Sequence, residues 1–120
     1  MSNKLKKFSK FLTSEDLVDI TLEIKKKKIK KFALNYRALI DNRWEQIYRI
    51  DNFHGFLHEQ RFWRGKDPIP IEEKLPNSII INKYIDFIVE NFYKFKHYFK
   101  ESKKNEIIKK RFINIINFHQ

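Results

Sequence analysis

The segment from Phe32 to Ile50 limits the fold more than any other part of the sequence. Apolar residues recur at every second position in Phe32, Leu34, Tyr36, Ala38 and Ile40, and the returning run of Trp44, Gln46, Tyr48 and Ile50 is apolar at all but Gln46. A period of two is typical of a strand with one buried face. Asp41-Asn42-Arg43 separates the two runs and has turn composition. We therefore expect an antiparallel β-hairpin here.

The length of the hairpin loop can be tested by register, because a slip of one residue reverses the face of every side chain. A two-residue loop would place Leu34 opposite Arg49, whereas a three-residue loop places Leu34 opposite Ile50. Only the second choice keeps one face apolar, so we predict a three-residue loop. Its expected pairs are Ile40–Trp44, Tyr36–Tyr48 and Leu34–Ile50.

The rest of the chain predicts a single α+β domain over residues 1–120. Residues 1–19 show near-helical spacing of Leu5, Phe8, Phe11 and Leu12 and predict a short N-terminal helix. Residues 20–72 predict a small antiparallel sheet of three to five strands, with Phe56 to Arg64 as the third strand and the Pro68–Ile71 segment restricted to an edge or a loop by its prolines. Residues 77–118 predict a long amphipathic helix over 78–100, a break at 101–105, and a final helix over 106–118.

Charge and composition narrow the class of protein. The 120 residues carry a net charge of +11 and no cysteine. The charge is +6 in residues 1–31, zero in 32–72 and +5 in 73–120. Such flanks favour polyanionic partners, which are RNA, DNA or an acidic protein. The missing cysteine excludes disulfides and thiolate zinc sites and fits a reducing cytoplasm. No apolar run is long enough to span a bilayer, so we expect no membrane partner. We also expect neither a cofactor nor a metal.

The stretch from Tyr48 to Arg61 contains the candidate catalytic residues, which are His58, His54, Arg61, Tyr48 and Asp51. Histidine exchanges protons near neutral pH, and an arginine could stabilise charge on a phosphorane. Strand alternation, however, places His58 and Arg61 on opposite faces. The alternative is a structural role in which Arg61 pairs with Glu59 or Glu45.

Five cations are candidates for contact with nucleic acid: Arg37, Arg49, Arg64, Lys26 and Lys28. Five of the six arginines lie in the electrically balanced centre, although lysine is the prevailing cation elsewhere. The guanidinium fork suits phosphate, but it equally suits Asp and Glu on a neighbouring strand. The lysine runs would add affinity without sequence specificity.

The sequence resembles the TumE family of small toxin–antitoxin proteins over roughly residues 20–100. The resemblance rests on Asp51-Asn52, Gly55 and His58, followed by Asp67-Pro68 and a C-terminal helix. Gln60 stands where that pattern tends to have a second histidine. The resemblance implies a growth-inhibiting toxin that acts on RNA and is paired with a cognate antitoxin protein. The alternatives are a non-catalytic nucleic-acid-binding module and a protein-interaction module, including a homodimer.

Overall fold

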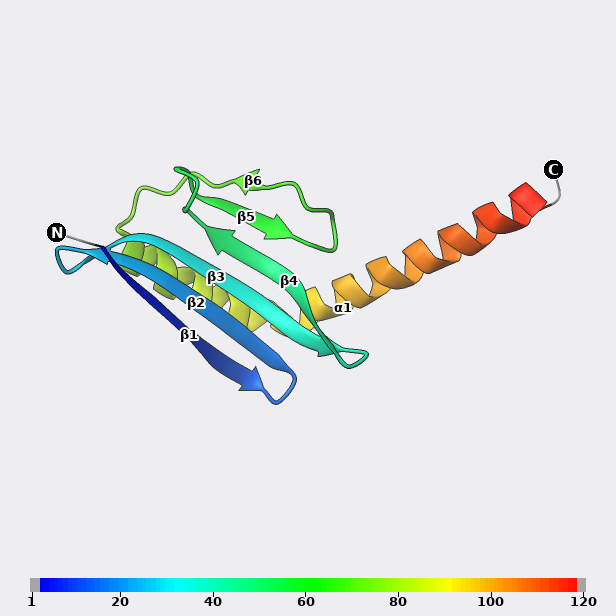
Figure 1. Ribbon diagram of the computed structural model, residues 1–120, viewed down its shortest axis with the longest axis horizontal. Coiled ribbons are helices and arrows are strands. Elements are labelled where there is room, and N and C mark those ends of the chain that lie inside the picture. Colours follow the sequence, from blue (N-terminus) through cyan, green and yellow to red (C-terminus); the bar gives the residue numbers. More distant parts are fainter. Residues whose placement is uncertain (1–2, 119–120) are drawn as a thin grey trace.

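The computed structural model describes residues 3–118, so the first two and last two residues of the predicted domain lie outside it. Six antiparallel strands form one sheet in chain order, and one 42-residue helix follows. The elements are β1 (Lys4–Thr13), β2 (Asp16–Lys25), β3 (Lys28–Ile40), β4 (Arg43–Asp51), β5 (His58–Arg61), β6 (Ile69–Pro70) and α1 (Asn77–Phe118). The first half of α1 lies across one face of the sheet and leaves the other face open (Figure 1). The α+β class is therefore as expected, with more strands than predicted.

The hairpin of β3 and β4 has the register of a two-residue loop next to the turn and the register predicted for a three-residue loop further along the strands. Its turn has two residues, Asp41 and Asn42, both with positive φ, and Ile40 pairs with Arg43. The predicted three-residue loop is therefore wrong. Four residues further along β4, a β-bulge at Ile47 shifts the register by one residue. Tyr36 then pairs with Tyr48 and Leu34 with Ile50, as the apolar pattern requires.

The predicted N-terminal helix is wrong, because residues 4–25 form the two strands β1 and β2. β1 is an edge strand, and nearly all of its side chains are exposed. An edge strand that neither face buries needs no alternation, so its chance helical spacing misled the prediction. Four lysines in β1 blunt the exposed edge, as charged side chains commonly do. Ser14 lies in the turn between β1 and β2.

The C-terminal region is one continuous helix rather than two. Residues 101–105 are polar but include neither glycine nor proline, so nothing in them interrupts the backbone hydrogen bonds. α1 buries the side chains of Ile81, Ile88, Phe92, Phe95 and Phe99 against the sheet. Beyond Phe99 the helix projects past the sheet (Figure 1). The separate final helix is therefore not observed.

Aromatic packing joins helix and sheet. Tyr36 and Tyr48 are fully buried beneath α1, where the Tyr48 ring stacks on Phe95 with centroids 5.3 Å apart. Tyr36 meets Phe92 edge to face at 5.9 Å. Such pairs add to the free energy gained from apolar burial. The core thus lies in a single layer between the sheet and residues 80–99.

The last strands are short. The predicted strand from Phe56 to Arg64 contains only the four residues of β5, because residues 52–57 form a loop and residues 62–64 a turn. The proline segment contributes the two-residue edge strand β6, which confirms its expected position at an edge. Among the described residues, α1 has no stretch apolar enough to cross a membrane.

Candidate functional site

The open face of the sheet carries polar side chains in two rows. Cross-strand pairing places Ser9, Asp19, Asn35, Arg49 and Gln60 in one row and Lys7, Thr21, Ala33, Asp51 and His58 in the next. Their strand neighbours, such as Tyr48 and Glu59, point to the opposite face and meet α1. The helix leaves this face open (Figure 1), and the side chains of the first row are exposed or half-buried. In the second row Ala33, Asp51 and His58 are buried, with Phe56 of the β4–β5 loop against the His58 ring.

Asp51 is the centre of a hydrogen-bonded cluster on this face. Its side chain is only 2% exposed and accepts from Arg49 Nε at 2.9 Å. His58 Nε2 lies 3.3 Å from the same carboxylate, and the backbone N–H of Phe53 donates to its other oxygen at 3.0 Å. The loop that follows β4 is thereby tied to the strand. The Asp51 carboxylate is fully occupied within the protein.

His58 is held on both sides of its ring. Nδ1 lies 3.2 Å from the carbonyl oxygen of Phe56, while Nε2 faces Asp51. The ring is buried, and both nitrogens are directed at oxygen atoms of the protein. His54, in contrast, is exposed in the loop between β4 and β5, with its ring centroid 6.1 Å from that of His58. Gly55 has φ +90°, a conformation that favours glycine in this turn.

Arg49 has both a fixed end and free ends. Its Nε is held by Asp51, and its terminal nitrogens make no hydrogen bond within the described part of the chain. The side chain borders two open cavities. One is about 840 Å³ and is also lined by His54, Gln60 and Arg64; the other is about 360 Å³ and is lined by Asn35. The buried Oδ1 of Asn35 has no hydrogen-bond partner among residues 3–118. Arg49 is thus placed to bind an anion from the open face.

Tyr48 and Arg61 belong to the other face. The Tyr48 hydroxyl donates to Glu59 at 2.6 Å, and Arg61 Nε donates to the same carboxylate at 2.7 Å. Burial, reinforced by the hydrogen bond to Glu59, holds the pKa of Tyr48 well above its usual value. The five catalytic candidates are therefore divided, with Asp51, His58 and His54 away from Tyr48 and Arg61. The expected alternation of β5 and the pairing of Arg61 with Glu59 are observed.

A second buried cluster escaped the sequence analysis. Asp16 accepts from the hydroxyls of Tyr36 at 2.6 Å and Thr13 at 2.5 Å, and Lys96 Nζ of α1 lies 3.2 Å from the carboxylate. Burial alone would raise the pKa of Asp16, but these hydrogen bonds and the Lys96 charge lower it overall. Eighty positions separate Asp16 from Lys96. Nothing in the local sequence could have shown that they meet.

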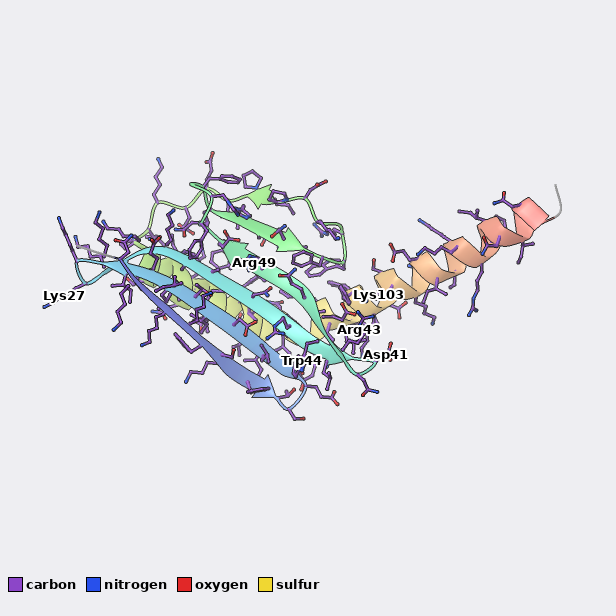
Figure 2. The ribbon with its side chains drawn as sticks, viewed as in Figure 1. Lys27, Asp41, Arg43, Trp44, Arg49 and Lys103 are labelled. Atoms are coloured by element: carbon purple, nitrogen blue, oxygen red, sulfur yellow. The ribbon has the colours of Figure 1, made fainter. Side chains whose placement is uncertain are left out.

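The nucleic-acid candidates are also distributed unequally. Arg37 donates to Asp19 at 2.6 Å, so it takes part in an ion pair, as the structural alternative expected. Arg64 is exposed at the turn after β5. Lys26 and Lys28 lie at the tip of the β2–β3 hairpin, and Figure 2 shows Lys27 at this tip, at the far end of the sheet from Asp41 and Lys103.

Lysines concentrate at that end of the sheet. β1 pairs with β2 so that Lys4 lies opposite Ile24, which brings the start of β1 beside the hairpin. We call the resulting set the basic end; it comprises Lys4, Lys6, Lys7, Lys25, Lys26, Lys27, Lys28, Lys30 and Lys31. Within residues 4–7 and 23–31, which form this end, Glu23 is the acidic residue. None of the nine lysines forms an ion pair within residues 3–118. The contribution of β1 was missed because that segment was predicted to be helical.

Comparison with known proteins gives a family but no activity. A family model described as Domain of unknown function (DUF7718) matches residues 1–105. The chain belongs to the DUF7718 family. Neither curated proteins nor solved structures provide a match. The DUF7718 match covers the whole sheet and the first 29 residues of α1, so both buried clusters lie inside it. It includes no link to toxins, and the TumE resemblance stays a prediction. In the described part of this DUF7718 chain, no three His, Asp or Glu side chains are grouped to hold a metal ion.

Proposed function

We propose that the protein binds single-stranded nucleic acid, RNA in particular, through the basic end. The two strand segments that form this end carry nine lysines, with Glu23 as their acidic neighbour, and make a local field stronger than that of the balanced centre. Glu73, which lies beside Lys30 and Lys31, is paired with Lys83 at 2.7 Å. Phosphate groups release counterions when lysines neutralise them, and this release drives association without sequence specificity. The open polar face begins directly beside this end.

The observation that carries the proposal is the backbone of the hairpin tip. Lys26 and Lys27 have φ values of 53° and 64°, in the left-handed region. Each such residue costs roughly 1–2 kcal/mol unless it is glycine, asparagine or aspartate. The β3–β4 hairpin solves the same geometric problem with Asp41 and Asn42, which tolerate that region. Two lysines at a strained tip, where asparagine or glycine would fit better, support a role for their charge.

An exposed aromatic beside the lysines suits an unpaired base. Phe56 is 47% exposed in the β4–β5 loop. It lines a cavity of about 350 Å³ together with Lys30, Lys31 and Lys74. Bases of single strands stack on aromatic side chains while cations hold the phosphates, at about 1–3 kcal/mol per base. A double helix hides its bases, so this combination favours a single strand.

The experiment substitutes the strained tip itself. The double variant Lys26→Asn/Lys27→Gly should raise the free energy of unfolding by about 1–2 kcal/mol, because both new residues accept positive φ. The same variant should weaken binding to a fluorescein-labelled 20-nucleotide RNA by about 25-fold at 0.1 M salt, from two lost phosphate contacts at a slope of about 0.7 each. Urea denaturation and fluorescence anisotropy measure the two effects.

The matched control is Lys94→Gln/Lys100→Gln, which removes the same charge from exposed positions on α1. Its RNA affinity should fall less than threefold or so, since only the general field changes. Equal losses in the two variants, or a tip variant that gains stability and keeps its affinity, would refute the proposal.

A second candidate is the toxin-like ribonuclease that the TumE resemblance implies, held in check by an antitoxin protein. The observation that favours it is the joint position of His54, Arg49 and Arg64 on the wall of the 840 Å³ cavity. His54 would exchange the proton and the arginines would stabilise the anionic transition state. Under this hypothesis, His54→Ala abolishes RNA cleavage and growth arrest but leaves RNA affinity unchanged. RNA that stays intact with the unmodified protein leaves binding as the function.

A further inference from the structure

The part of α1 that projects beyond the sheet has an apolar side of its own. The stripe that packs on the sheet ends at Phe99, and the same side of the helix continues with Ser102, Lys103 and Glu106. We call residues 101–118 the tail (Figure 1). Lys103 pairs with Glu45 at 2.8 Å where the tail leaves the sheet, near Arg43 in Figure 2. The sheet therefore does not cover the tail's apolar residues.

Three large side chains of the tail form a narrow seam: Ile108, Phe112 and Ile115, which are 54%, 63% and 57% exposed. Their spacing of four and then three residues matches the d, a and d positions of a heptad repeat. Exposed apolar side chains in such a row on a projecting helix mark an interaction surface.

Cations flank the seam on both sides. In the same heptad frame, Lys104 and Arg111 occupy g positions and Lys109 an e position, and Asn105 precedes Ile108 at an a position. Residues at e and g determine the choice of partner through interhelical ion pairs. Among residues 3–118 these three cations form no ion pair. We propose that the tail docks against an amphipathic helix of another protein whose e and g positions are acidic.

A second copy of this chain does not fit the seam. In a parallel pair, a g residue faces the e residue five positions further on, which sets Lys104 against Lys109 of the other copy. In an antiparallel pair, g positions face g positions, so Lys104 and Arg111 would meet cations again. Like charges in these positions destabilise the pair. The net charge of +11 on each chain adds to the repulsion.

A membrane surface fits less well than a helix. Arg111 lies one helical turn after both Ile107 and Ile108. Its charge therefore separates Ile107 from the seam, and the apolar face of the tail stays narrow. A helix that lies in a lipid interface needs a broad apolar face, whereas a seam of three residues suits one partner helix.

The test uses a labelled designed peptide of three heptads with leucine at a and d and glutamate at every e and g position. The complete chain should bind this peptide. A triple variant in the seam, Ile108→Ser/Phe112→Ser/Ile115→Ser, should weaken binding at least tenfold. A control variant outside the seam, Ile107→Ser/Ile113→Ser, should leave binding unchanged. Lys104→Glu/Lys109→Glu/Arg111→Glu should transfer the preference to a peptide with lysine at e and g. A peptide of the same composition with its leucines moved off the seam controls for simple charge attraction to the basic end.

Each outcome has a defined consequence. The proposal is overturned if the control peptide with displaced leucines binds as tightly as the designed peptide, or if the Ile108→Ser/Phe112→Ser/Ile115→Ser variant binds as tightly as the unmodified chain. Sedimentation as a dimer that Phe112→Ser dissociates, or binding to phosphatidylserine vesicles that depends on the same seam residues, also overturns it. Lys26→Asn/Lys27→Gly should leave peptide binding unchanged, and the seam variant should leave RNA binding unchanged, so this proposal and the nucleic-acid proposal can fail separately.

Discussion

Replacing Asp51 by asparagine should separate a structural role of the Asp51–His58 cluster from a catalytic one. The substitution preserves shape and the acceptor for the Phe53 amide, 3.0 Å away. It removes the carboxylate oxygen that lies 2.9 Å from Arg49 Nε and 3.3 Å from His58 Nε2. An amide nitrogen turned to that side would oppose the Arg49 donor.

The expected loss follows from burial. A buried hydrogen bond to a charged group contributes about 1.5–3 kcal/mol, and breaking a buried ion pair costs about 3–5 kcal/mol. Arg49 is 31% exposed, so water replaces part of its contact and the lower end applies. We expect Asp51→Asn to lower the free energy of unfolding by about 2 kcal/mol and the urea midpoint by about 1 M.

Urea unfolding followed by the fluorescence of Trp44 and Trp63 measures the loss. The control is Asp41→Asn, the same chemical change at an exposed turn residue whose φ of 52° asparagine also tolerates. The unfolding free energy of both variants should depend on urea concentration with the same slope. The unfolding free energy of the control should lie within about 0.5 kcal/mol of that of the unmodified protein. An Asp51→Asn protein as stable as that control would refute the structural role. Loss of an activity at full stability would instead place Asp51 and His58 in a catalytic role.

Two further predictions concern the buried carboxylates. The pKa of Asp16 is lowered from its ordinary value of 3.8, so the unfolded chain takes up a proton at a higher pH than the folded one. Asp16 therefore stabilises the fold above pH 3.8 and ceases to do so as the pH falls through its folded pKa. Asp16→Asn should reduce the loss of unfolding free energy on acidification, measured by urea unfolding at a series of pH values. An unchanged dependence on pH would contradict the assignment. Tyr48→Phe removes the hydroxyl that donates to buried Glu59 at 2.6 Å and should lower the free energy of unfolding by about 1–3 kcal/mol. The control Tyr93→Phe, at an exposed position, should change it little. Similar values for both variants in urea unfolding would show that the hydrogen bond contributes nothing.

Local sequence was sufficient where one face of a strand is buried. The alternation from Phe32 to Ile50 predicted the pairs Tyr36–Tyr48 and Leu34–Ile50, both of which the structure shows. The turn failed, because alternation fixes which residues face the core but not how a bulge at Ile47 absorbs the extra residue. β1 failed for the converse reason: it is an edge strand with both faces exposed, so burial leaves no pattern in its sequence.

The candidate site shows the same division. Alternation along β5 was enough to separate His58 from Arg61. The polyanionic partner that the charge predicts stays a prediction. The pairings that decide what these groups do were not readable, since Asp51 with Arg49 and His58, or Asp16 with Lys96, depend on which strands and helix meet. The basic end required β1 to fold back beside the hairpin.

The sequence by itself therefore determined the fold class, the pairing of Tyr36 with Tyr48 and of Leu34 with Ile50, and the excess of positive charge, because each depends on residue type and local period. Only the tertiary structure decided which charges are neutralised, which histidine is free, and where nine lysines gather. Electrostatic interactions act between residues that are close in space, whatever their separation along the chain. The position of those lysines at a strained hairpin tip and along an edge strand is thus a property of the fold.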